Sequence, residues 1–488
     1  MFGSKTRYLV DFLCELQLPD SCRSSLITSL EAYYTGKEAE LKILREFERD
    51  YVPDKAIWWY TRETFLFRLL NKALRQRNIK LMFQFAFFIQ DLYQQLKRAE
   101  EDFKILHNPD NTLEVYRGQL MSREEIEKFK EDDDFLINSF FSTTLDRKIA
   151  LFFISLTDPK EGFERVLLEI KIDIKLHTRP YADISKLHYC KGESEVLFMI
   201  GTKLKLRSKK PYWNENEKIW IIQLELCPIQ QDSEKNKVPD ESMRKSLKKH
   251  VNKLLNPWLY VVLEPKDMQE IFNALVDFYP NETWIDATRI HCQAKILQWR
   301  FENFYEALEL YDEALYKWTL YLEDEEIDCM ADIAELEANF AECYRENTMF
   351  ANMHYDSAIS YYKLALEKET NQEEKMNIYY KMSSVYEAKI QACSYDEDNE
   401  KDREEKVSTG CNAIRHQEHI IEQLSSQHPI NEEKIAQNRL VLGSFCWLID
   451  KYDEAIQHYS TALEVFLTNV DLKGHSTVLS RTLERLVN

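Results

Sequence analysis

Three short stretches in the first half of the chain carry residue types that can do chemistry. They are Arg117 with Gly118, the hydroxyl run at 142–144 (Ser-Thr-Thr), and the acidic pair Glu193 and Glu195. A planar guanidinium binds phosphate groups well, and a fixed carboxylate stabilises a developing positive charge. Each stretch alone also has a structural interpretation: an arginine paired with a surface carboxylate, a helix cap, and two glutamates facing water. Their order within one small domain favours a common site.

The elements that would position these residues are strands. From about Leu113 the hydrophobic pattern has a period of two, which is typical of half-buried strands. Strand-like runs lie at 113–119, 165–174, 195–206 and 218–226, and a short helix is expected at 147–156. We therefore predict an α+β domain, a small mixed β-sheet sandwich over residues 105–228, with Arg117 in its first strand.

The segments on either side of this domain have different patterns. Residues 1–104 show helical periodicity and many aromatic residues, which predicts an all-α N-terminal region with a packed core. Glycine is scarce, with 9 in 488 residues, and this also favours long helices with few tight turns. A polar stretch at 230–240 contains Pro239 and predicts a linker over 229–255.

The last part of the chain contains an internal repeat. Small and aromatic residues stand at the spacing of a tetratricopeptide (TPR) unit, whose two helices cross closely at small side chains: Leu442, Gly443, Ala455, Tyr459 and Ala462. The last three positions recur at Ala307, Tyr311 and Ala314, and again at Ala358, Tyr362 and Ala365. We predict an all-α TPR solenoid over residues 256–488.

Charge and hydropathy exclude several classes of protein. The formal net charge is −20, and because residues 1–228 are balanced, the whole excess lies in the second half. This excess disfavours a nucleic-acid partner. No apolar run approaches the ~18 residues of a membrane span, and we find no signal-peptide or lipid-anchor pattern. The ten cysteines include no C-x-x-C pair, so we expect reduced thiols and a cytoplasmic protein.

The three stretches resemble the motifs of mono-ADP-ribosyltransferases of the arginine–serine–glutamate class, which use NAD. That family has an Arg-Gly on its first strand, an aromatic-x-Ser-Thr-Ser strand, and a Glu-x-Glu that leads a later strand. The matching residues here are Arg117-Gly118, the run 140–144 (FFSTT), and Glu193 with Glu195. The third motif residue of the middle strand is Thr144 instead of serine, which keeps a hydroxyl. The resemblance covers roughly residues 105–228 and implies that they form the catalytic domain.

The resemblance also implies roles for these residues. Glu195 would stabilise the cationic sugar that forms when the nicotinamide–ribose bond breaks, and would hold a ribose hydroxyl. Glu193 would bind the acceptor arginine, because Glu-x-Glu in this class implies transfer to arginine. Arg117 would bind the NAD diphosphate, and Gly118 would let backbone groups reach the nicotinamide amide.

Further roles follow from the same resemblance. Ser142 would hydrogen-bond Glu195 and orient it, and Thr143 would support the strand and the ribose. Tyr189, in the turn at 181–192, is a candidate contact with the target protein. We expect NAD as co-substrate and no metal: His416 and His419 have no third ligand nearby and are more typical of a solvated helix face.

Three functions remain open at this point. The first is an NAD-dependent transfer of ADP-ribose to exposed arginines of protein substrates, with the TPR repeats recruiting partner proteins. The second is NAD hydrolysis at the same site, with water in place of arginine. The third is a TPR interaction scaffold whose transferase domain is inactive. The acidic repeat region leads us to expect basic partner proteins and neither nucleic acid nor a membrane span.

Overall fold

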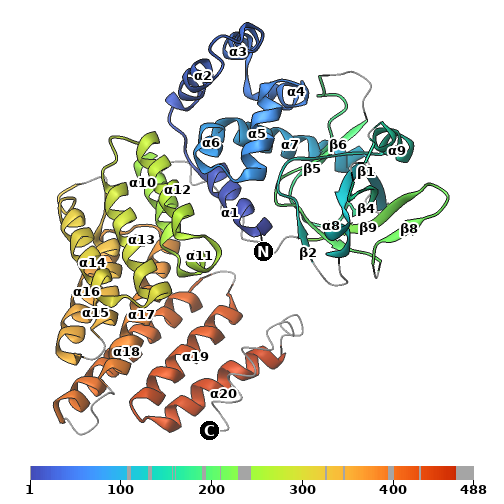
Figure 1. Cartoon of the computed structure of the whole chain (residues 1–488). Helices are drawn as coiled ribbons and strands as arrows, with labels where there is room; N and C mark the ends of the chain where they lie inside the picture. The colour runs from blue at the N-terminus through green and yellow to red at the C-terminus, as the bar shows by residue number, and fades with distance from the viewer. Residues whose placement is uncertain are drawn as a thin grey trace. The chain divides into compact units, whose positions relative to one another are not determined.

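The computed structural model describes residues 2–106, 112–129, 134–156, 158–159, 161–189, 194–208, 210–228, 243–324, 327–344, 347–393, 400–427 and 430–468. The chain divides into two compact units. The first comprises Met1–Lys253 and Trp258–Glu282, and the second comprises Leu254–Pro257 and Thr283–Asn488. Figure 1 labels the elements of both units.

The first unit begins with helices, in agreement with the periodicity of residues 1–104. They are α1 (Phe2–Glu15), α2 (Ser21–Tyr33), α3 (Glu38–Asp50), η1 (Pro53–Lys55), α4 (Ala56–Thr61), α5 (Phe65–Gln76), α6 (Ile79–Gln84) and α7 (Ala86–Leu106). Thr64 caps α5, because its hydroxyl oxygen accepts the Leu66 N–H at 3.3 Å. The aromatic side chains of Trp59, Phe83 and Phe88 are fully buried, so they form the core of these helices.

A nine-stranded sheet follows the helices in the same unit. Its strands are β1 (Thr112–Ser122), β2 (Asp134–Leu136), β3 (Phe141–Thr144), β4 (Phe163–Asp173), β5 (Tyr181–Asp183), β6 (Glu195–Phe198), β7 (Lys203–Leu206), β8 (Tyr212–Asn214) and β9 (Ile219–Leu226). The strand order is β2-β7-β9-β4-β1-β3-β6-β5, and β8 pairs with β9. Strands β4 and β9 are parallel, and the other pairs are antiparallel. Two short helices, α8 (Arg123–Glu127) and α9 (Arg147–Ser155), interrupt the strands.

The structure corrects the expected strand at 195–206. This run forms two strands, β6 and β7, which pair with different parts of the sheet. A turn separates them at Gly201, which has a φ of 79°, a conformation that residues with a side chain rarely adopt. Residues 196–200 form an unbroken apolar run and Leu204 and Leu206 continue it beyond the glycine, so the hydrophobic pattern alone did not reveal the break. The strands expected at 113–119, 165–174 and 218–226 correspond to β1, β4 and β9.

The remaining elements are helical. They are α10 (Met243–Asn252), η2 (Lys253–Leu255), α11 (Pro257–Val262), α12 (Pro265–Phe278), α13 (Trp284–Phe301), α14 (Phe304–Thr319), α15 (Met330–Cys343), α16 (Thr348–Lys368), α17 (Gln372–Ala392), α18 (Glu400–Ser425), α19 (Glu432–Leu448) and α20 (Tyr452–Thr468). The segment 229–255, expected to be a linker, therefore contains α10. Residues 229–242 of that segment lie outside the described part of the chain.

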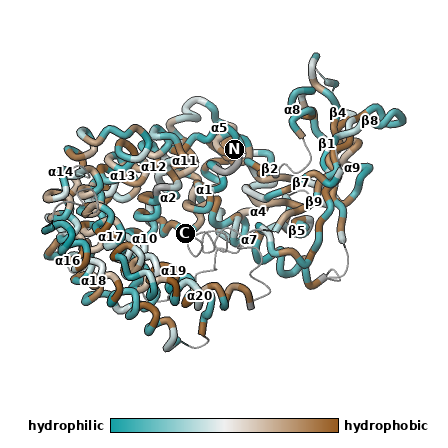
Figure 2. Tube along the Cα trace, turned by 90° about the horizontal axis from the view of Figure 1, so that it is seen from below, coloured by the Kyte–Doolittle hydropathy of each residue, from teal (hydrophilic) through white to brown (hydrophobic). Residues whose placement is uncertain are grey.

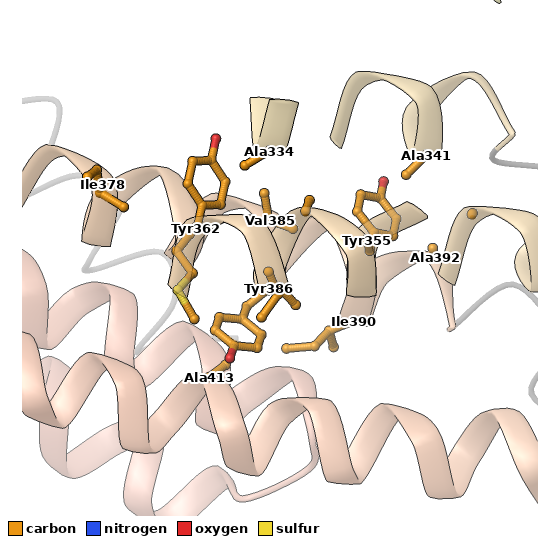
Figure 3. Close-up of a cluster of buried hydrophobic side chains, with 14 of the residues drawn as sticks. Ala334, Ala341, Tyr355, Tyr362, Ile378, Val385, Tyr386, Ile390, Ala392 and Ala413 are labelled. Carbon is orange, nitrogen blue, oxygen red and sulfur yellow. The ribbon is translucent and has the colours of Figure 1, made fainter. Parts of the chain in front are cut away.

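The second unit is built from consecutive helices that pack against one another, α13 on α14, α15 on α16, and α19 on α20 (Figure 1). Small residues allow close crossing: a Cβ added to Gly443 of α19 would lie 2.6 Å from the Tyr459 ring of α20. Figure 3 shows the core between α15, α16 and α17, where Tyr355, Tyr362 and Tyr386 lie among aliphatic side chains. The predicted repeat positions are thus contact positions between helices.

Hydropathy along the helices is mixed. Figure 2 shows hydrophilic and hydrophobic residues interleaved along α13 to α18. Over the described residues, no helix combines the length and the apolar character that crossing a membrane requires.

Candidate active site

The sheet brings Arg117, the hydroxyl run at 142–144 and Glu195 onto neighbouring strands. Strands β1, β3 and β6 are adjacent in the strand order, although they are far apart in the sequence. In the pairing of β3 with β6, Thr144 lies opposite Glu195 and Ser142 lies opposite Leu197. Ser142 and Glu195 therefore project from the same face of the sheet as diagonal neighbours. On the other side of β3, Tyr116, the residue before Arg117, lies opposite Thr144, so β1 pairs with β3 beside these residues.

Arg117 lies across strand β3. Its Nη1 donates to the Ser142 carbonyl oxygen at 2.7 Å, its Nε donates to the Gln119 side chain at 3.1 Å, and its guanidinium lies 4.5 Å from the centre of the Phe141 ring. Burial lowers the pKa of Arg117 from its ordinary value, while Tyr60 and Glu195 oppose that shift. Within the described residues nothing accepts a hydrogen bond from Nη2. The side chain is a half-buried cation that is close enough to Glu195 for the two charges to interact.

Glu195 is paired with a histidine that the sequence motifs do not include. The Nε2 atom of His188 lies 2.9 Å from Oε2 of Glu195, and their side chains are only 5% and 13% exposed. The expected hydrogen bond from the Ser142 hydroxyl to Glu195 is not formed among the described residues. In the register of β3 and β6, the pair Thr143–Val196 lies between Ser142 and Glu195, so the two side chains are not directly opposite each other. His188 instead approaches Glu195 from the turn before β6.

The two threonines of the middle motif bond within the protein. Thr143 is 4% exposed, and its hydroxyl donates to the Val196 carbonyl oxygen at 2.8 Å, which fits the expected support of the strand. The Thr144 hydroxyl oxygen accepts the Asp146 N–H at 3.1 Å, and Asp146 in turn caps α9 by accepting the Lys148 N–H at 2.8 Å. Thr144 therefore begins the turn into α9, and a serine there would supply the same acceptor.

Gly118 has a packing role. A Cβ at this position would lie 2.1 Å from Cγ1 of Ile154 and 2.4 Å from the Ala150 carbonyl oxygen. Helix α9 therefore crosses β1 directly over Gly118, and any side chain would displace it. This close approach is a structural reason for the glycine, and the expected contact with nicotinamide stays a prediction.

Tyr189 contacts helix α4. Its N–H donates to the Thr61 hydroxyl oxygen at 2.9 Å, and its ring centre lies 5.1 Å from that of Trp58. The Arg62 guanidinium lies 5.4 Å from the Tyr189 ring. The side chain is still 44% exposed, so one part of it remains open to a partner. Glu193, the expected acceptor-binding residue, lies outside the described residues.

Helices α4 and α5 also contribute to the site. The Tyr60 ring lies 5.1 Å from that of Phe140, and its hydroxyl is within hydrogen-bonding distance of the Asn71 side chain. Burial raises the pKa of Tyr60, and the nearby charge of Glu195 raises it further. Sequence patterns placed these helices in a separate region, because Tyr60 and Glu195 belong to distant segments. The sheet and the first helices instead form a single compact unit.

No group of three or more histidine, cysteine or acidic side chains is arranged to hold a metal within the described part of the chain. His416 and His419 both contact Tyr379, the first through its carbonyl oxygen at 3.0 Å and the second through its hydroxyl at 3.2 Å. They connect α18 to α17 and are part of the helix packing.

Comparisons with known proteins give only faint likenesses. No family model matches the chain, and no curated protein matches it. Among solved structures, the Vis toxin, an ADP-ribosyltransferase from Vibrio splendidus, is 18% identical over 45% of this chain and 89% of its own, with a TM-score of 0.26. C3stau2 from S. aureus, solved with NAD, is 17% identical over 37% and 89%, with a TM-score of 0.26. RapI is 14% identical over 51% and 60%, with a TM-score of 0.32. Similarity at this level assigns neither a family nor an activity.

Proposed function

We propose that the first unit is an NAD-dependent ADP-ribosyltransferase that transfers ADP-ribose to arginine side chains of proteins. The observation that carries the proposal is the pairing of β1, β3 and β6, which brings Arg117, Ser142 and Glu195 together. These residue types suit the cleavage of NAD, and they stand on three neighbouring strands. A half-buried guanidinium held by two hydrogen bonds, with Nη2 unbonded within the described residues, fits a diphosphate.

Glu195 would act on the bond between nicotinamide and ribose. When this bond breaks, its electron pair leaves with the ring nitrogen and nicotinamide departs as a neutral molecule. Positive charge then develops on the ribose, and a carboxylate fixed beside it stabilises this charge without reorganising. Burial within the sheet strengthens the interaction, because the local dielectric is low.

The acceptor step would depend on Glu193. A guanidinium nitrogen of the target attacks the ribose carbon, and a proton must leave that nitrogen as the new bond forms. A carboxylate two residues before Glu195 can bind the guanidinium and accept the proton. Water in the same position would give NAD hydrolysis instead, so the products decide between the two reactions.

We further propose that helices α13 to α20 form TPR-like repeats that recruit partner proteins. The support is the burial of the predicted small and aromatic positions, including Ala307, Tyr311, Ala455 and Tyr459. The excess negative charge of residues 229–488 favours basic partners, which carry exposed arginines. A target whose binding by the full chain weakens as salt is added would support this recruitment, and salt-independent binding would contradict it.

The experiment that tests the proposal incubates the full chain with NAD and agmatine, a small guanidine, and measures both ADP-ribosyl-agmatine and free ADP-ribose. Wild-type protein is expected to form the adduct. Glu193→Gln is expected to lose the adduct and to keep part of the hydrolysis, because its carboxylate serves the acceptor. Free ADP-ribose without adduct would identify a hydrolase, and intact NAD would favour the inactive scaffold.

A further inference from the structure

We propose that His188 is the positioning residue that fixes Glu195 for NAD cleavage, an inference that rests on the proposed function. His188 belongs to none of the three motifs, yet its Nε2 atom lies 2.9 Å from Oε2 of Glu195. Both side chains are almost fully buried. A buried carboxylate needs hydrogen-bond donors, and a charged acceptor makes such a bond strong.

The contact occupies one oxygen of the carboxylate. With Oε2 held by the imidazole, rotation of the Glu195 side chain is restricted, and Oε1 keeps a defined direction for the substrate ribose. Within the described residues no hydroxyl group hydrogen-bonds the Glu195 carboxylate, since Ser142 lies diagonally across from Glu195 in the pairing of β3 with β6. The histidine therefore performs the orienting role that the motif pattern assigned to the serine.

The turn that carries His188 is itself bound to the strand of Glu195. The Ile184 N–H donates to the carbonyl oxygen of Glu195 at 2.9 Å, and the Leu187 N–H donates back to the Ile184 carbonyl oxygen at 2.8 Å. Asp183 accepts the Ser185 N–H at 2.9 Å at the start of the turn. Both the main chain and the side chain of Glu195 are thus held by the same short segment.

Helix α4 anchors the other end of this segment. Tyr189, the residue after His188, donates its N–H to the Thr61 hydroxyl oxygen. Its ring contacts the Trp58 ring and the Arg62 guanidinium. Arg62 is fixed by a two-bond ion pair with Glu46, at 2.7 and 3.0 Å. These contacts limit where the imidazole can lie. They give the first helices a part in catalysis, because they position the group that orients Glu195.

The test measures nicotinamide release from NAD by the full chain and three variants. His188→Ala is expected to lower kcat by about tenfold to a hundredfold, the scale of a hydrogen bond to a charged group, with a much smaller change in KM for NAD. His188→Gln places an amide N–H near the position of Nε2 and is expected to recover most of kcat. His188→Asn has a shorter side chain and is expected to behave like His188→Ala.

A wild-type kcat in His188→Ala would overturn the inference. Equal losses in all three variants would also overturn it, because they would mean that packing and not the Nε2 donor matters. Thermal unfolding of each variant identifies any loss that comes from misfolding.

A second readout does not depend on turnover. In a ¹⁵N NMR spectrum of the histidine side chains, the His188 signal is assigned by its disappearance in His188→Gln. This signal is expected to shift when Glu195 is changed to Gln, and an unchanged signal would overturn the pairing. If the signal shifts but wild-type protein leaves NAD intact, the pairing is supported and the proposed function fails.

Discussion

Each compact unit buries a histidine, and the two histidines have opposite surroundings. In the first unit, His188 faces the carboxylate of Glu195. In the second unit, His291 is completely buried, its Nε2 lies 3.1 Å from the Asn339 amide nitrogen, and its Nδ1 has no partner among the described residues. Burial, assisted by the nearby charge of Lys295, lowers the pKa of His291 to about 3. One imidazole orients an acid, and the other is a neutral part of a helix core.

The contrast extends to the units as a whole. In the sheet unit, polar contacts gather at two neighbouring groups: Gln119 and the Ser142 carbonyl oxygen accept from Arg117, and His188 contacts Glu195. In the helical unit, the buried polar groups join helices: Lys295 of α13 and Lys381 of α17 both bind Glu335 of α15 at 2.6 Å. Convergence on one reactive group indicates a site, whereas contacts spread along a stack of helices indicate structure.

The largest change in stability is expected from glycines at close crossings. Gly118→Ala is expected to lower the free energy of unfolding by about 3 kcal/mol, because the new methyl group would meet Ile154 and the backbone carbonyl of Ala150. Gly443→Ala is expected to cost less, about 1 kcal/mol, since the Tyr459 side chain can move aside. Urea unfolding of the two variants measures the difference. Equal losses of unfolding free energy in the two variants would contradict the view that the backbone of α9 packs rigidly on β1 at Gly118.

The next effect concerns pH. Because the pKa of His291 is lowered from 6.5 to about 3, the unfolded state binds more protons between these values, and the folded state loses stability as pH falls below about 6.5. Between pH 7 and 5 the expected loss is about 2 kcal/mol. His291→Gln retains an acceptor for Asn339 and should remove this pH dependence. The measurement is urea unfolding of both proteins at pH 7 and pH 5.

The same variant also tests whether the two buried histidines differ in their effect on NAD cleavage. His291→Gln is expected to leave NAD cleavage unchanged, because the residue lies in the helical unit. A variant that unfolds with the same pH dependence as wild type would contradict a lowered pKa of His291 in the folded protein.

The smallest effect is expected at Thr144. Thr144→Ser keeps the hydroxyl that accepts the Asp146 N–H, so the free energy of unfolding should change by less than about 0.5 kcal/mol. Thr144→Val loses this acceptor and is expected to cost about 1 kcal/mol. Thermal unfolding of the pair tests whether the hydroxyl, and not the β-branched shape, is what the turn into α9 requires.

The sequence predicted those features that depend on local pattern. The alternation of apolar residues located β1, β4 and β9, and the hydroxyl motif and Glu195 lie on adjacent strands. The break between β6 and β7 was missed, because apolar residues stand on both sides of Gly201 and the turn depends on the backbone conformation of that one residue.

The parts of the site that the sequence did not predict are contacts between distant segments. Tyr189 bonds to Thr61, which is 128 residues away in the chain. His188 reaches Glu195 only because the turn between β5 and β6 folds back. No spacing rule encodes such a contact. The only signal in the sequence was an imidazole seven residues before an acidic strand end, and this spacing does not distinguish a buried contact from a histidine exposed to solvent.

The most direct test of the central claim compares the same substitution on two strands of one sheet. Nicotinamide release from NAD is measured for wild type, Glu195→Gln and Glu225→Gln, where Glu225 is a surface partner of Lys205 on β9. Glu195→Gln is expected to lose at least ~10²-fold in kcat, the scale for removing a preorganised charge. Glu225→Gln is expected to retain the wild-type rate. Wild-type turnover in Glu195→Gln, or equal losses in both variants, would contradict a catalytic site at the junction of β1, β3 and β6.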